Sequence, residues 1–348
     1  MPQRRLDRSY ALARQKFLES AQAGHARVES FPHPMTGLDG EELAIDVAQI
    51  GDPEADSVLV IVCGIHGVEG FTSSALQSWW LDERAGGLDA TAPRVVLIHG
   101  LNPVGFSWVR RANEDNVDIN RNFVDWSNPP VNVDYPEIAE ALTPREWTEL
   151  AQAESAGQLL AFAGNVGIEA MSQILIRGQY DYPAGVFYGG SGPAWSHRWL
   201  TEHLSALIGP ATRLAIMLLH TGAGEWATGE LTCREPNPND WWQEMRALQN
   251  GTISERFGEW LETVDDATPG VEFSAATLEF GVVDLITALQ ALRADAWLYA
   301  YGDPTSTEAA AIRHQVRAAF ADDDPAWLAK VIERFDEVTT VAVAGLSR

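Results

Sequence analysis

Two histidines and one glutamate have the residue types and placement of a hydrolytic metal site. His66 and Glu69 lie in the segment CGIHGVEGF, directly after the apolar run 58–63, and His220 follows a second apolar run, 214–219. Two imidazoles and one carboxylate bind zinc and leave its fourth position for water. The sequence therefore predicts one zinc ion per chain, held by His66, Glu69 and His220.

The His66–Glu69 pair is a weak signal by itself, because a histidine followed three positions later by a glutamate arises easily by chance. On that alternative reading, His66 is partly exposed beside a solvated Glu69. Two features favour the metal site. Glycines flank the pair in a turn after a buried strand, and His220 precedes Thr-Gly-Ala-Gly, a turn that can expose an imidazole.

Arg110, Arg111 and Arg121 fall within twelve residues of a chain that has 49 acidic and only 24 basic residues. An arginine guanidinium is a planar fork with a fixed charge, suited to a carboxylate or an oxyanion. This cluster predicts recognition of an anionic substrate group. On the alternative reading, the arginines pair with the acidic residues of a surface loop, Glu114, Asp115 and Asp118.

Glu279 stands near the end of the apolar run 273–280. A carboxylate in such a place is costly unless it is paired or functional. A zinc-bound water needs a base beside it, and Glu279 is the natural candidate. The alternative is a structural glutamate in a salt bridge.

The elements that must position these residues alternate between strands and helices. The predicted strands are 43–50, 58–63, 94–99, 213–219 and 273–280. The predicted helices are 7–24, 72–84, 143–176, 196–208, 284–293, 307–320 and 326–336, and the segments 102–135 and 178–195 read as loops. Such alternation predicts an α/β layered fold, in which ligands bind at the carboxyl ends of the strands. No linker divides the chain, so we expect one catalytic domain over 1–348, with its core at about 40–300 and its C-terminal helices at about 307–336.

Composition limits the partners. A net charge of −25 argues against nucleic acid and against anionic membrane surfaces, which require basic residues. No apolar stretch reaches the ~18 residues of a membrane helix, and the N-terminus reads as an amphipathic helix without the apolar region of a signal peptide. We expect a cytoplasmic protein; the sequence makes no prediction of its oligomeric state.

The motifs, in this order, resemble the zinc carboxypeptidase superfamily, which includes deacylases related to aspartoacylase and succinylglutamate desuccinylase. They are His66-x-x-Glu69, Asn102-Pro-x-Gly-Phe106, Arg111, Asp118-x-Asn-Arg-Asn-Phe123, His220 and Glu279. Within the superfamily, the chain looks most like an uncharacterised bacterial branch known only as a domain of unknown function or a carboxypeptidase-like peptidase. The segments that carry this likeness are 64–70, 111–123, 178–180, 187–190 and 219–222, and the resemblance spans roughly residues 40–300.

The resemblance implies a three-layer α/β/α sandwich around a mixed, mostly parallel sheet of about eight strands. It places zinc on His66, Glu69 and His220 and makes Glu279 the general base. Arg111, or alternatively Arg110, would polarise the scissile carbonyl. Asn120 and Arg121 would grip the terminal carboxylate of a substrate.

The implied activity is hydrolysis of an amide bond beside a free carboxylate, as in a carboxypeptidase that acts on small peptides. The first alternative is an N-acyl amino acid deacylase, whose chemistry is the same. The second is a non-catalytic relative that only binds metal. Leu219 favours that last possibility, because many relatives of this branch are expected to have an acidic residue before the third metal ligand.

Overall fold

The computed structural model describes residues 5–89, 91–234 and 239–348, and its centre is one seven-stranded sheet. The strands are β1 (Arg27–Thr36), β2 (Glu42–Ile50), β3 (Ser57–Val62), β4 (Arg94–His99), β5 (Arg213–Ala223), β6 (Gly229–Arg234) and β7 (Glu272–Val283). Their order across the sheet is β1-β2-β4-β3-β5-β7-β6.

The sheet is mixed, with its four central strands parallel. β4, β3, β5 and β7 pair in parallel, whereas β2 and β6 run antiparallel to their neighbours β4 and β7. β1 is antiparallel to β2 and so points the same way as the central four. The expected mixed, mostly parallel sheet is confirmed, with seven strands where about eight were expected.

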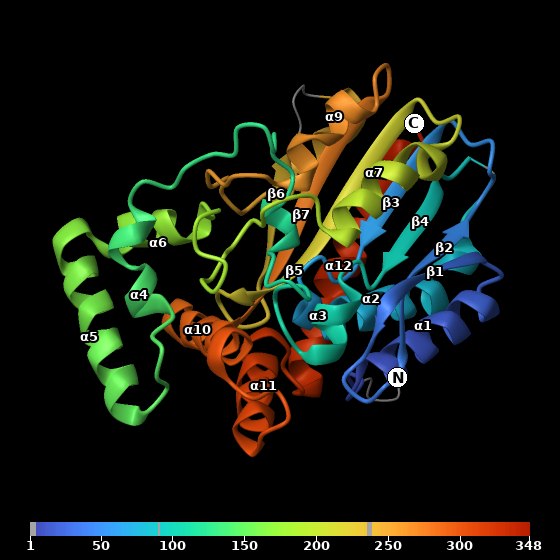
Figure 1. Cartoon of the computed structure of the whole chain (residues 1–348). Coiled ribbons are helices and arrows are strands. Elements are labelled where there is room, and N and C mark those ends of the chain that lie inside the picture. The colour runs from blue at the N-terminus through green and yellow to red at the C-terminus, as the bar shows by residue number, and fades with distance from the viewer. Residues whose placement is uncertain (1–4, 90, 235–238) are drawn as a thin grey trace.

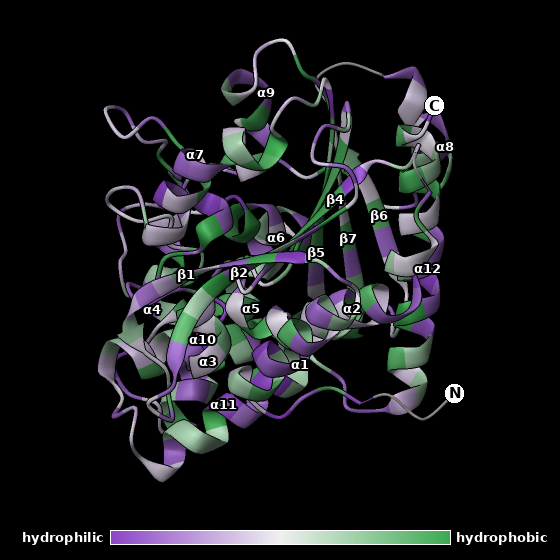
Figure 2. Ribbon diagram, turned by 90° about the vertical axis from the view of Figure 1, so that its right-hand side faces the viewer, coloured by the Kyte–Doolittle hydropathy of each residue, from purple (hydrophilic) through white to green (hydrophobic). Residues whose placement is uncertain are grey.

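The central strands form because their sequences are continuous apolar runs. Every residue of β3 (SVLVIV) and β4 (RVVLIH) is buried, as expected for parallel strands covered on both faces. Figure 2 shows the hydrophobic colour concentrated along the strands in the interior. Two strands were not predicted: β1, which is mostly exposed and has two prolines, and β6, in the segment after 219 that reads as a loop.

Helices pack on both faces of the sheet, and the described residues form twelve α-helices. They are α1 (Tyr10–Ala23), α2 (Gly70–Glu83), α3 (Pro103–Trp108), α4 (Ala139–Leu142), α5 (Glu149–Val166), α6 (Ile168–Ile176), α7 (Trp195–Ile208), α8 (Gln243–Ala247), α9 (Val264–Ala267), α10 (Leu285–Tyr301), α11 (Thr307–Phe320) and α12 (Pro325–Leu346). Side chains of α1, α2 and α12 share one hydrophobic core with one face, and those of α7 share a second core with the other. The expected α/β/α sandwich is thereby confirmed (Figure 1).

Some predicted bounds need correction. The first strand of the sheet, β1, begins at residue 27, and side chains of α1 such as Tyr10 and Phe17 also lie in the hydrophobic core. The segment 102–135 contains the short helix α3, and 143–176 holds two helices that break at Gly167, where φ is +93° and the backbone leaves the helical region. The last helix continues to residue 346.

No single helix in the described ranges is long and apolar enough to cross a membrane, but α5 and α6 together, bent by 112°, meet that test by length and composition. Figure 1 shows α5 projecting away from the sheet, with α10 on its inner side.

Candidate metal centre and substrate cavity

The three predicted metal ligands converge at the carboxyl edge of the central strands. His66 and Glu69 lie in the turn that follows β3, and His220 lies on β5, its parallel neighbour. All three are buried, and their ligand atoms lie within 4.8 Å of one another. The sheet thus unites residues that are 151 positions apart in the chain.

The turn that carries His66 and Glu69 is held by the segment that carries Arg110 and Arg111. The amides of Gly67 and Val68 donate to the carbonyls of Arg111 and Arg110, at 3.1 and 2.8 Å. Gly67 is required for this close approach, because a Cβ there would collide with the backbone of Gly105 and Phe106 at α3. The turn that carries His66 and Glu69 and the segment that carries Arg110 and Arg111 therefore pack together as one unit.

The donor atoms suit a cation. Nδ1 of His220 lies 3.1 Å from Nδ1 of His66 and 2.8 Å from a carboxylate oxygen of Glu69, and Nδ1 of His66 lies 2.9 Å from the other oxygen. Tetrahedral zinc with ligands at about 2.1 Å would separate its donors by roughly 3.4 Å, somewhat more than these distances. Two imidazole nitrogens and a carboxylate aimed at one point satisfy a metal ion better than they satisfy one another. The residues present fit zinc.

Asp118 sits behind His66. Its Oδ1 lies 3.1 Å from His66 Nε2, and a carboxylate there favours the tautomer that leaves the Nδ1 lone pair free for a metal. Burial alone would raise the pKa of Asp118, but Arg111 and His66 outweigh it and hold that pKa well below its ordinary value. Asp118 therefore stays ionised. From the sequence, Asp118 was expected only as part of a motif and as an ion-pair partner of the arginines.

Glu69 is also held ionised. Burial would raise its pKa, but the neighbouring His66 and His220 outweigh that effect and keep the pKa far below the ordinary value for a glutamate. A carboxylate without its proton is the form that binds a metal.

His220 differs from His66 in its second nitrogen. Its buried Nε2 has no hydrogen-bond partner within the described ranges. Leu219 packs into the core on the side of α2 and α12, because successive residues of a strand point to opposite faces. An acidic residue at position 219 would thus point away from the imidazole of His220.

Glu279 stands beside His220 in the sheet. The two residues are direct register partners on the parallel strands β5 and β7, so their side chains project from the same face. Glu279 and the three metal-site residues line one cavity. The alternative reading of Glu279 as a structural glutamate requires a salt bridge. No residue in the described part of the chain forms an ion pair with Glu279.

The two neighbouring arginines point in different directions. Arg111 lines the cavity and donates to Glu69 at 3.1 Å and to Asp118 at 3.1 Å, while its Nη2 lies 2.9 Å from His66 Nε2. Arg110 forms an ion pair of 2.8 Å with Asp295 on α10. Arg110 thus ties its segment to a helix, away from the metal-site residues.

Arg121 lines the cavity wall, while Asn120 lies behind it. The guanidinium of Arg121 donates to the carbonyls of Ile176 and Asn120 at 2.6–2.9 Å, and burial lowers its pKa to about 10, so it remains charged at neutral pH. The side-chain oxygen of Asn120 accepts from the amide of Trp260 at 3.3 Å.

Arg256 is a further cation of the cavity that the sequence analysis missed. It donates to Glu259 at 3.1 Å. Burial lowers its pKa, but Glu259 and Glu279 outweigh that effect and the pKa is raised. In the sequence, the one feature that could have indicated a functional role for Arg256 is that it is a basic residue in an acidic chain.

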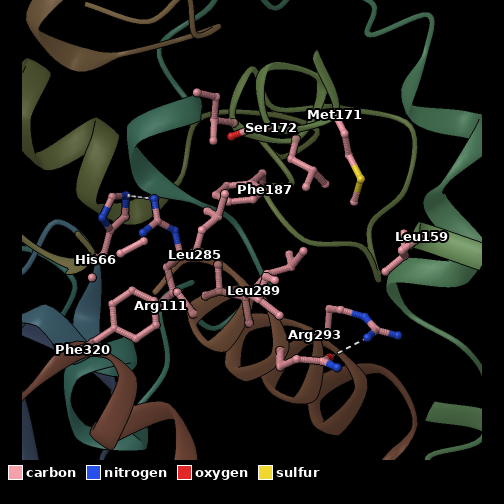
Figure 3. A pocket seen from close by; sticks show the side chains of 18 of the residues that line it. His66, Arg111, Leu159, Met171, Ser172, Phe187, Leu285, Leu289, Arg293 and Phe320 are labelled. Atoms are coloured by element: carbon pink, nitrogen blue, oxygen red, sulfur yellow. Dashed lines mark hydrogen bonds between the residues drawn. The ribbon is translucent and has the colours of Figure 1, made fainter. Parts of the chain in front are cut away.

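The cavity has a volume of about 300 Å³ and two chemically different ends. His66 and Arg111 lie at one end in Figure 3, and apolar side chains such as Leu289 and Met171 lead from them toward Leu159. The polar end offers the three candidate metal ligands, the carboxylate of Glu279 and the guanidinium groups of Arg111, Arg121 and Arg256. The remainder is a mostly apolar surface from α5, α6 and α10, interrupted by Ser172, Gln290 and Arg293.

One family model matches nearly the whole chain. The model of a family described as "Protein of unknown function (DUF2817)" matches residues 7–334. No curated protein matches.

Several solved structures are similar to the chain. One is from Shewanella amazonensis and is provisionally named a metallopeptidase (15% identity, 83% of this chain and 90% of that one, TM-score 0.42). Another is carboxypeptidase A from Helicoverpa armigera (10%, 91% and 74%, 0.42). A third, from Shewanella frigidimarina, is provisionally named a succinylglutamate desuccinylase/aspartoacylase (17%, 86% and 73%, 0.35).

Proposed function

The chain belongs to the DUF2817 family, and we propose that it is a zinc-dependent hydrolase that cleaves an amide bond beside a free carboxylate. One observation carries the proposal: the buried donors of His66, Glu69 and His220 converge within 4.8 Å on the wall of a cavity that also holds Glu279 and four arginines. Metal ligands, a base and cations in one cavity are the parts that such a reaction needs.

A zinc ion held by His66, Glu69 and His220 would supply a water of lowered pKa and an electrophile for the amide carbonyl. Glu279 is the group we assign to proton transfer, since it lines the cavity beside His220 and forms no described ion pair. Its carboxylate accepts a proton from the attacking water and passes it to the leaving nitrogen. The carbon–nitrogen bond breaks, the carbonyl carbon keeps the water oxygen, and an amine and a carboxylate leave.

Arg111 is the arginine we assign to the oxyanion. When His66 carries its proton on Nε2, that nitrogen cannot accept from the Arg111 Nη2 that lies 2.9 Å away. The N–H is then available to a substrate oxygen that gains charge in the transition state. Arg110 forms an ion pair with Asp295 on α10. We assign Arg110 to holding its own segment, which includes Arg111, against that helix.

The free carboxylate of the substrate is assigned to Arg121, helped by Arg256, which also lines the cavity. Arg121 is already hydrogen-bonded to the carbonyls of Ile176 and Asn120, which fixes the direction of its guanidinium before substrate arrives. We assign Asn120 to support of that arginine, since it does not line the cavity.

Two substrate classes share this chemistry. A carboxypeptidase would release the C-terminal residue of a small peptide, and a deacylase would release the acyl group of an N-acyl amino acid. The apolar part of the cavity favours the second, because it offers few hydrogen-bonding groups to a peptide backbone.

The test is hydrolysis of a panel of short peptides and N-acyl amino acids by zinc-loaded protein, with amine release as the readout and His220→Ala as the control. We expect turnover by the native chain and none by the variant. Full zinc binding without turnover of any substrate would instead identify a non-catalytic metal-binding protein.

A further inference from the structure

The apolar part of the cavity is a groove between α5 and α6 on one side and α10 on the other. Its walls are mostly aliphatic, with Leu159, Met171, Leu175, Leu289 and Leu292, and Ser172, Gln290 and Arg293 line it as well. The lining of α10 runs from residue 285 to residue 293, a rise of about 12 Å. That length exceeds the reach of any single apolar amino-acid side chain. Hereafter these walls are called the α5–α10 groove.

The groove exposes large aliphatic side chains at its mouth. Leu160, Ile168 and Ile286 all line the cavity and are 70%, 72% and 69% exposed. Contiguous apolar surface of this kind marks a binding site. Because the mouth is open while the floor is buried, the groove suits a long, thin apolar group.

The position of α5 is fixed by polar contacts at its base. Arg293 on α10 donates to Ser155 of α5 at 2.6 Å and to the carbonyls of Ala141 and Leu142 at 2.8 and 3.1 Å. Trp147, before α5, stacks on Trp297 of α10. The groove is therefore a built feature of the fold.

We propose that the α5–α10 groove binds the unbranched acyl chain of a long-chain N-acyl amino acid, the substrate of the hydrolysis proposed above. For the reaction, this proposal rests on the proposed function. For the ligand, it rests on the continuity of the cavity between the metal end and the groove. One cavity joins Arg111, Arg121, Arg256 and the candidate metal ligands to the mostly aliphatic walls, where Arg293 also lines the cavity, so a ligand with an anionic head and an apolar tail matches its two ends. The amide would lie at the metal end and the chain would extend along α10.

The first test is a series of N-acyl derivatives of one amino acid, from acetyl to dodecanoyl, with kcat/KM as the readout. Full burial of a methylene improves binding by about fourfold, and the open mouth reduces this gain. We expect kcat/KM to rise about twofold or more per methylene up to the length of the groove. A flat or falling series alongside real turnover of acetyl substrates or peptides would overturn the groove proposal and leave the proposed function standing.

The second test compares two leucines of α5. Leu160 lines the groove, whereas Leu150 is 69% exposed and does not. Leu160→Glu should lower the ratio of dodecanoyl to acetyl kcat/KM by about tenfold or more, because it puts a charge against the chain. Leu150→Glu should leave that ratio unchanged. Equal effects of the two substitutions would contradict the proposal.

A binding test separates the ligand from the reaction. Metal-free protein is titrated by calorimetry with dodecanoyl and acetyl derivatives of the same amino acid. Tight, Leu160-dependent binding of the dodecanoyl compound without any hydrolysis by zinc-loaded protein would support the groove and reject the proposed function. Absence of chain-length-dependent binding would overturn the groove. Two further measurements compare the Leu150→Glu and Leu160→Glu variants: binding to phosphatidylcholine vesicles and self-association. Equal loss of either in both variants would assign the exposed leucines to a membrane or to a second copy of the chain, and would overturn the groove proposal.

Discussion

Asp118 Oδ1 lies 3.1 Å from His66 Nε2, and the other oxygen of Asp118 accepts from Arg111 Nε at 3.1 Å. One buried carboxylate thus orients both the imidazole assigned to the metal and the guanidinium assigned to the oxyanion. The same oxygen Oδ1 accepts from the backbone amide of Asn120 at 3.0 Å, so the segment before Arg121 is tied to this carboxylate as well.

Asp118→Asn should weaken zinc binding by about 10- to 100-fold, as loss of a carboxylate behind a metal-bound histidine does elsewhere. Zinc affinity is measured by competition with a chelator. Asp115→Asn is the matched control, since Asp115 is an exposed residue of the same loop. An unchanged affinity in the Asp118 variant would mean that the pair does not position a metal ligand.

Glu279→Gln should lower kcat by about 10²- to 10⁴-fold while zinc content stays the same, because the amide cannot accept the proton of the attacking water. Steady-state kinetics and metal analysis on one preparation check both parts. Glu230→Gln is the control: Glu230 is the exposed register partner of Glu279 on β6 and does not line the cavity. Near-native turnover in the Glu279 variant would remove it from the role of base.

Arg111→Met and Arg110→Met should fail in different ways. We expect Arg111→Met to lower kcat by about 10²- to 10³-fold, the usual cost of one lost donor to an oxyanion. Arg110→Met breaks a largely buried ion pair with Asp295 and should lower the free energy of unfolding by about 3 kcal/mol. Urea denaturation and kinetics together separate the two effects. A large loss of kcat in a stable Arg110 variant would reverse the assignment.

His99 should make stability depend on pH. It is fully buried, stacks on Phe17 and interacts with the Ser74 hydroxyl at 2.9 Å, and burial lowers its pKa to about 4. The folded state thus binds the proton more weakly than the unfolded state. The stability contributed by neutral His99 is complete above about pH 6.5 and is lost as pH falls toward 4, by about 3 kcal/mol. His99→Gln should flatten this slope in urea denaturations between pH 7 and 4.5, and an unaltered slope would contradict the assignment.

The strands that could be predicted from the sequence are those whose formation is dominated by the burial of apolar side chains. β3, β4, β5 and β7 are continuous apolar runs because both their faces are covered. β1 was missed because it is an edge strand, mostly exposed, whose prolines resemble a loop signal. Its pairing with β2 is a tertiary contact that no local pattern encodes.

The site divides in the same way. His66, Glu69 and His220 follow or end buried strands, so the topology brings them together once the strands pair in parallel. Arg110 and Arg111 could not be distinguished, because adjacent residues of an irregular segment point in directions that only packing decides. Arg256 and the α5–α10 groove could not be predicted from the sequence. The positions of the segments that form them are set by tertiary contacts, such as the hydrogen bond from Arg293 to Ser155.

Anomalous X-ray diffraction at the zinc edge, from crystals grown with one equivalent of zinc, tests the metal centre most directly. We predict one strong peak, about 2.1 Å from Nδ1 of His66 and of His220 and from a carboxylate oxygen of Glu69. A chain that takes up no zinc at this point, or takes it up only elsewhere, would contradict the metal centre and the hydrolase proposal that depends on it.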